Sequence, residues 1–147
     1  MTANNQSSEL LVVERTIDAP AAQVWQAMTM KDAMSDWFFD LKEFKAQAGF
    51  EFEFTVEHEG NTYRHLCKVT EAVPHKKLAF TWRYHGHEGN SLVTFELFPE
   101  GNKTKMKLTH SGLETFPKTP QFARKNFEGG WSAITTALKE HVEKAQG

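Results

Sequence analysis

Apolar and polar side chains alternate through the middle of the chain. Between residues 50 and 56, phenylalanine or valine occupies every second position, and glutamate or threonine stands between them. Because successive side chains of a strand point to opposite faces, this pattern predicts an antiparallel strand with one apolar and one solvated face. Similar runs follow over residues 62–71, 78–84, 93–97 and 106–110, separated by turn-forming Gly, Asn and Pro residues. The pattern therefore predicts an antiparallel sheet.

Two other segments carry apolar side chains at helical spacing. Residues 13–29 predict a strand, a corner and a short helix, since Pro20 fits a first helical turn, where no backbone N–H is needed. The apolar stripe of this helix consists of Val24, Trp25 and Met28. Near the C-terminus, a spacing of three and four residues predicts one buried face of a longer helix, made by Phe127, Trp131, Ile134, Leu138 and Val142.

The C-terminal segment also contains signals that start and interrupt helices. Thr119 and Pro120 fit its N-cap and first turn. Gly129 and Gly130 follow, and two adjacent glycines cost a helix roughly 1 kcal/mol each relative to alanine. We therefore expect a break between a short helix and the main one. The alternative is a hinge that lets the helix end move over a cavity mouth.

Four motifs are shared with a known superfamily. They are I-D-A-P-A-A-Q-V-W at residues 17–25, Trp37, A-V-P-H-K-K-L-A-F-T-W at residues 72–82, and L-T-H-S-G-L at residues 108–113. In this order they resemble the START-like (SRPBCC) helix-grip superfamily, and within it the branch named after the activator of the heat-shock chaperone ATPase. The resemblance covers nearly the whole chain. One departure is Ala48-Gly49, where relatives commonly carry two glycines.

The resemblance implies an α+β, helix-grip fold. In it, a strongly curved antiparallel sheet wraps around a long C-terminal helix, two short helices follow the first strand, and imperfect closure leaves a cavity between sheet and helix. The length of 147 residues suits one domain. We expect that domain over residues 10–147, preceded by a disordered tail at residues 1–9.

The composition of the chain argues against several classes of function. The formal charge of −2, without a basic block, argues against a nucleic-acid partner. No apolar run reaches membrane-spanning length, and the first residues lack the features of a signal peptide. The single cysteine, Cys67, excludes an intramolecular disulfide and fits a reducing compartment. We expect a cytoplasmic protein that is a monomer or a weak homodimer.

An aromatic sheet face covered by a single helix suggests a cavity for an apolar ligand. The expected lining consists of Trp37, Phe52, Phe54, Tyr63, His65, Cys67, Phe80, Trp82, Tyr84, Phe95, His110, Trp131 and Ile134. The tyrosines and histidines among them are expected to hold the polar end of the ligand. For His65 and His110 the alternative is a core residue whose hydrogen bonds are satisfied within the protein.

Three consecutive aromatic residues, Trp37, Phe38 and Phe39, stand in a connecting segment. They cannot all point inward from one helix end, so at least one is expected near the surface or at the cavity rim. The segment is either a plug that seals the open end of the sheet or a lid over its opening. The sequence does not distinguish the two.

No metal, cofactor or catalytic residue is expected. His85 and His87 have a spacing used by metal ligands, but the strand alternation turns His85 toward solvent and no third ligand is near in sequence. Burial in a strand should raise the pKa of Cys67 and suppress its reactivity. Motifs for serine hydrolases and for nucleotide binding do not occur.

Three functions fit these observations. The first is a protein that binds a small hydrophobic or aromatic molecule, lipids included. The second, which the resemblance implies, is a protein-interaction module similar to chaperone-ATPase activators, in a stress-response setting and with a protein partner. The third is an enzyme of the cyclase or dehydratase type found elsewhere in the superfamily, with His110 or His65 as acid or base. A fold determines architecture better than activity, and we favour the first.

Overall fold

Strand β1 (Leu11–Ile17) and two short helices, α2 (Ala21–Thr29) and α3 (Lys31–Trp37), open the fold in the computed structural model, which describes residues 10–39 and 41–146. Five strands follow: β2 (Glu51–His58), β3 (Asn61–Val73), β4 (Lys77–Tyr84), β5 (Ser91–Glu100) and β6 (Lys103–Ser111). Two 3₁₀ turns, Leu113–Thr115 and Pro120–Phe122, lead to the long helix α4 (Arg124–Gln146). The expected tail at residues 1–9 lies outside the described residues.

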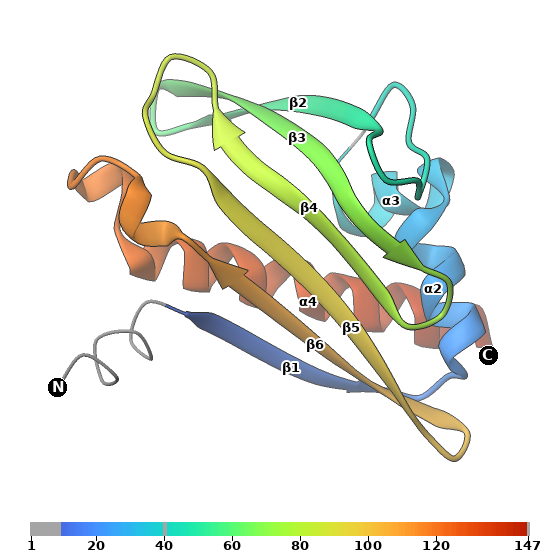
Figure 1. The fold of residues 1–147 in the computed structure, drawn as a ribbon. Helices are drawn as coiled ribbons and strands as arrows, with labels where there is room; N and C mark the ends of the chain where they lie inside the picture. The colour runs from blue at the N-terminus through green and yellow to red at the C-terminus, as the bar shows by residue number, and fades with distance from the viewer. Residues whose placement is uncertain (1–9, 40, 147) are drawn as a thin grey trace, which may run out of the picture.

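The six strands form one antiparallel sheet in the order β1-β6-β5-β4-β3-β2. Strands β2 to β6 pair with their neighbours in sequence, whereas β1 pairs with β6, with Leu11 opposite His110. The sheet is curved and α4 lies across its concave side, with α2 and α3 near the C-terminal end of α4 (Figure 1). This arrangement confirms the predicted α+β fold, a curved antiparallel sheet around a long C-terminal helix with two short helices after the first strand.

The predicted faces of the strands are confirmed. In β2, Phe52 and Phe54 are buried while Glu51 and Glu53 are exposed. In β5 and β6 the buried side chains include Val93, Phe95, Leu97, Met106, Leu108 and His110. The pairing of β3 with β4 shifts register between Val69 and Glu71. Since such an irregularity bends a strand and increases its twist, it contributes to the curvature around α4.

Pro20 stands before α2 and not within its first turn. It occupies the N-cap with an extended backbone (φ −66°, ψ 154°), and its carbonyl accepts the Val24 N–H at 3.2 Å. Val24 and Met28 of the predicted stripe are buried, but Trp25 is only half-buried. Ala27 completes the buried face of α2.

Of two predictions about the C-terminal segment, one is confirmed for a shorter helix and the other is wrong. Thr119 and Pro120 are the N-cap and first position of a 3₁₀ turn, without a capping hydrogen bond from the threonine side chain, and α4 starts only at Arg124. Helix α4 then continues through Gly129 and Gly130 without a break. Its predicted apolar face packs on the sheet, where Phe127, Trp131, Leu138 and Val142 are buried and Ile134 is half-buried. This packing outweighs the low helix propensity of the glycines.

Replacing either glycine by alanine is expected to stabilise the protein. Both are exposed, neither has a positive φ, and, apart from the adjacent residues and the surrounding helix backbone, a Cβ added at either position meets no atom within 4 Å. Gly129→Ala and Gly130→Ala should each raise the free energy of unfolding by about 0.5–1 kcal/mol in urea titrations. The matched control is Ala133→Gly, at an exposed position of the same helix, which should lower it by about 1 kcal/mol. Loss of stability in both alanine variants would contradict this expectation.

Candidate functional site

Aromatic side chains from the sheet and from α4 meet on the concave side of the sheet. All the predicted lining residues are buried except Tyr63 and Ile134, which are half-buried. Ring contacts connect the strands to the helix: the centroids of Trp82 and Trp131 lie 5.1 Å apart, and those of Phe95 and Trp131 lie 6.2 Å apart. Trp37 joins them from α3, with its ring 6.2 Å from Phe95. The structure therefore gathers most of the predicted lining into one aromatic cluster.

Phe38 and Phe39 fill the space above this cluster. The Phe38 ring lies 5.4 Å from Phe54 and is stacked on Trp131 at 6.5 Å, while the Phe39 ring is stacked on Phe54 at 4.2 Å. Both side chains are half-buried, and Trp37 beside them is buried. In this structure the aromatic segment is thus the plug. Two pockets in the described part of the chain lie elsewhere.

His110 lies at the centre of a buried hydrogen-bond chain. Trp131 Nε1–H donates to His110 Nδ1 at 2.9 Å, which leaves the proton of the neutral ring on Nε2. That N–H donates to Ser91 Oγ at 2.6 Å, and the Ser91 hydroxyl donates to the Trp82 carbonyl at 2.9 Å. Burial lowers the pKa of His110 to about 3. Since both ring nitrogens are engaged within the protein, His110 is a core residue that joins α4 to the sheet and not a candidate acid or base.

His65 lies near the plug, and Tyr84 lies beside His65, with ring centroids 4.7 Å apart. The His65 ring is stacked on Phe54 at 4.3 Å and lies 6.2 Å from Phe39, and its Nδ1–H donates to the Tyr63 carbonyl at 3.1 Å. Burial lowers the pKa of His65 to about 4, although backbone hydrogen bonds at Tyr63 and Phe54 act in the opposite direction. The Tyr84 hydroxyl accepts the Trp82 Nε1–H at 2.9 Å. Burial raises the pKa values of Tyr84 and Cys67, so both stay protonated near neutral pH.

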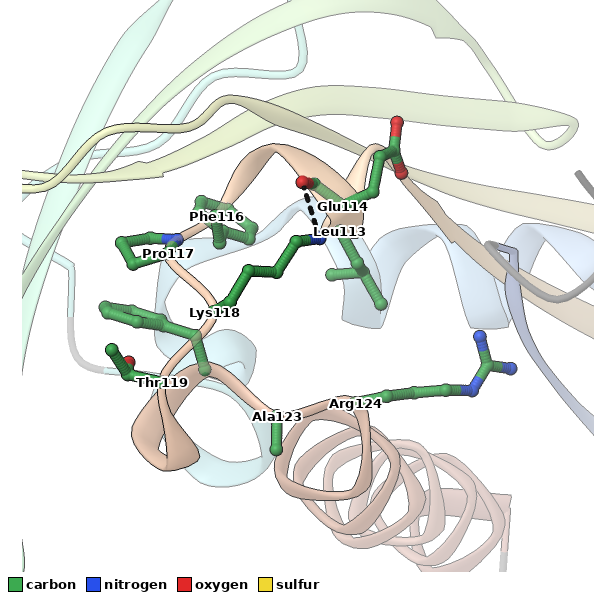
Figure 2. Close-up of a pocket in the computed structure, with 9 residues that line it drawn as sticks. Leu113, Glu114, Phe116, Pro117, Lys118, Thr119, Ala123 and Arg124 are labelled. Atoms are coloured by element: carbon green, nitrogen blue, oxygen red, sulfur yellow. Dashed lines mark hydrogen bonds between the residues drawn. The ribbon is translucent and has the colours of Figure 1, made fainter. Parts of the chain in front are cut away.

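A pocket lies outside the aromatic cluster, between the segment after β6 and the start of α4 (Figure 2). Its volume is about 350 Å³. Its lining consists of Leu113, Glu114, Phe116, Pro117, Lys118, Thr119, Phe122, Ala123 and Arg124, none of which belongs to the predicted site. A smaller pocket of about 160 Å³ lies between α2, α3 and the end of α4. The only sequence signal for the larger pocket is the pair of prolines, Pro117 and Pro120, which marks a turn-rich segment between two buried phenylalanines.

His85 and His87, the pair considered as a metal site, are not joined by further ligand side chains among the described residues. His85 and His87 are both exposed in the turn between β4 and β5. Within the described ranges, no group of three His, Cys, Asp or Glu side chains is placed to hold a metal ion. None of the helices in those ranges has the length and apolar character that crossing a bilayer requires.

The curved sheet, the enclosed helix and the aromatic cluster between them define a helix-grip protein. The chain belongs to the family described as activator of Hsp90 ATPase homolog 1-like protein, whose model matches residues 18–143. This match confirms the resemblance drawn from the four sequence motifs. None of the curated proteins compared matches the chain.

Solved structures show the same fold over nearly the whole chain. Protein MLL2253 from Mesorhizobium loti is 26% identical, with a TM-score of 0.75 over 92% of this chain and 97% of that one. The Aha1 dimer from Colwellia psychrerythraea is 22% identical, with a TM-score of 0.71 over 94% and 98%. DynU16, a protein of the dynemicin biosynthetic locus, is 20% identical, with a TM-score of 0.76 over 93% of this chain and 48% of that one.

Proposed function

We propose that the protein binds a small hydrophobic or aromatic molecule between the sheet and α4, in the space that Phe38 and Phe39 fill in the free protein. The observation that carries this proposal is the position in the chain from which the Phe38 and Phe39 rings come. They come from the segment after α3 and not from the sheet or α4, and they are half-buried while the rings beneath them are buried. A ligand therefore takes the place of two loop side chains without any change in the sheet.

The chemistry of the buried cluster favours an uncharged ligand. The described buried side chains include no Asp, Glu, Lys or Arg, and the lowered pKa of His65 keeps its imidazole neutral near pH 7. A bound charge would thus lose its hydration without gaining a partner. Hydrogen bonds to the polar end of a ligand are assigned to His65 and the Tyr84 hydroxyl, because both nitrogens of His110 are already engaged. The remaining predicted lining residues supply apolar contact.

Removing one plug ring is expected to tighten ligand binding. In Phe38→Ala the space is already empty before the ligand binds. The binding free energy therefore no longer includes the cost of displacing the Phe38 ring. The neutral dye N-phenylnaphthylamine should bind saturably, about tenfold more tightly than to the natural protein, as measured by energy transfer from tryptophan. The matched control is Phe98→Ala, which removes an exposed phenylalanine of β5 and should leave the affinity unchanged.

A second variant tests the position of the ligand. Cys67→Phe adds volume to the buried face of β3 and should weaken dye binding more than it weakens folding. If the dye binds neither protein and Cys67→Phe only unfolds the chain, the cluster is a permanent core and the proposal fails.

The alternative is a protein-interaction module, and the family name is the observation that favours it. It implies a chaperone ATPase as the partner and a stress-response setting. Failure of the dye experiments would make stimulation of a chaperone ATPase the deciding measurement. Under either function we propose a cytoplasmic location and a monomer or weak homodimer, with the dimeric Aha1 of Colwellia psychrerythraea as support for self-association. An enzymatic role through His110 has no support in the geometry, since its ring nitrogens face protein partners.

A further inference from the structure

The pocket between the segment after β6 and the start of α4 has the size of a ligand site. Its volume of about 350 Å³ lies within the range that small-molecule pockets span. It opens beside the backbone of residues 113–119 (Figure 2), and neither Phe38 nor Phe39 lines it. Whatever binds here does not need to displace the plug.

The apolar wall of this pocket is held in place from behind. The rings of Phe116 and Phe122 are stacked, with centroids 5.9 Å apart. Both rings contact Tyr84, at 5.4 Å and 5.2 Å, and Phe116 is also stacked on Phe127 of α4 at 5.7 Å. Phe116 and Phe122 are themselves buried, so the apolar surface that the pocket exposes comes mainly from Leu113, Pro117 and Ala123, which are half-buried. The wall is therefore preformed and suits a small apolar or aromatic body.

Two cationic side chains stand at the rim. The Lys118 ammonium donates one hydrogen bond, at 3.1 Å, to the backbone carbonyl of Glu114, and an ammonium has three protons to donate. In Figure 2 the carboxylate of Glu114 points away from this ammonium, and no ion pair joins Lys118 to a carboxylate among the described residues. Arg124 adds positive charge on the other side, where Glu128 and the Leu10 carbonyl fix its guanidinium. Lys118 is consequently the group best placed to receive an anion.

We propose that this pocket binds a small aromatic carboxylate, with the aromatic body against Leu113, Pro117 and Ala123 and the carboxylate on Lys118. The charge distinguishes this site from the buried cluster, which favours neutral molecules. Arg124 contributes positive potential and is held in place by Glu128.

The test is a titration of the protein with naphthoate and, in parallel, with the uncharged naphthalenemethanol. Naphthoate should bind saturably and shift the backbone amide resonances of residues 113–124. Lys118→Gln should weaken naphthoate binding about fivefold, the effect of losing one exposed ion pair, and should leave naphthalenemethanol binding unchanged. Raising the salt concentration should weaken only naphthoate. The control Lys125→Gln removes the neighbouring lysine, which does not line the pocket, and should change neither affinity.

A filling variant tests the apolar half of the site. Ala123 lines the pocket, is half-buried and has an extended backbone that leucine also adopts (φ −68°, ψ 146°). Ala123→Leu should reduce the affinity for naphthoate, whereas Phe38→Ala should leave naphthoate affinity unchanged. Absence of saturable naphthoate binding would overturn the proposal. So would naphthoate binding that survives both Lys118→Gln and Ala123→Leu. Because Phe38→Ala acts only on the buried cluster, failure here is distinguishable from failure of the proposed function.

Discussion

Replacing Trp131 by alanine is expected to lower the free energy of unfolding by about 3–5 kcal/mol, the usual cost of truncating a buried aromatic side chain. We expect a value near the upper end, because two effects combine. The indole is 2% exposed and contacts Phe38, Trp82 and Phe95. Its loss also leaves His110 Nδ1 without a donor in a buried site. Urea titrations measure the change directly.

Two further variants separate these effects. Trp131→Phe keeps much of the ring volume and removes the indole N–H, so it should cost less than Trp131→Ala, with about 1–3 kcal/mol from the lost hydrogen bond and a smaller part from the space left by the shorter ring. Trp25→Ala removes the half-buried tryptophan of α2 and should cost less than Trp131→Ala. A loss below about 1 kcal/mol for Trp131→Ala would exclude this residue from the core and remove the link that joins α4 to the sheet.

Acidification from neutral pH to about pH 4.5 is expected to destabilise the protein strongly through His65 and His110. Unfolded histidine takes up a proton near pH 6.5, whereas burial lowers the pKa values of these two to about 4 and about 3 in the folded state. Between these values the unfolded state binds more protons, so stability rises with pH and falls on acidification. Two protons give a slope of about 2.7 kcal/mol per pH unit. Over the roughly two pH units between about pH 6.5 and about pH 4.5, the free energy of unfolding falls by on the order of 5 kcal/mol.

Histidine variants identify the source of this slope in urea titrations at several pH values. His65→Phe should reduce it by about half, since one buried imidazole remains. His85→Gln, which removes an exposed histidine, should leave it unchanged. The carboxyls of Glu53 and Glu143 act in the same direction at lower pH, because hydrogen bonds from Arg64 and Lys139 lower their pKa values. Both carboxyls are present in every variant, so their contribution cancels when the pH slopes of the variants are compared. An unchanged slope in His65→Phe would contradict the assignment.

The strands and their inward faces could be predicted from the sequence because local alternation determines them. Phe52, Phe54, Phe95 and His110 each occupy the buried face that the period of two assigns to them. The same pattern indicated which side chains would meet under α4. The role of His110 could be predicted only in part. The alternation predicts that its side chain points inward, but it does not predict that Trp131 donates a hydrogen bond to its ring.

The remaining features depend on contacts between distant segments. The glycines of α4 predicted a break, and it is absent because the buried face of the helix packs on the sheet on both sides of them, an interaction that local propensity does not include. Whether Phe38 acts as a plug or as a lid depends on the path of the chain after Trp37. A loop has no periodic pattern of side chains from which this path could be predicted. The pocket beside Lys118 was missed because a 3₁₀ turn, an extended residue and a helix start build it jointly.

The pairing of β1 has a consequence for synthesis on the ribosome. This strand leaves the exit tunnel early, but its sheet partner β6 begins only at Lys103. Further bonds tie it to α4: Lys139 Nζ donates to the Thr16 carbonyl at 2.8 Å, and the Asp18 N–H donates to Glu143 Oε2 at 2.8 Å. A nascent chain that has not yet released β6 and α4 therefore carries a strand with unpaired backbone groups, which is a site for aggregation. Slow translation through the final helix would prolong that exposure.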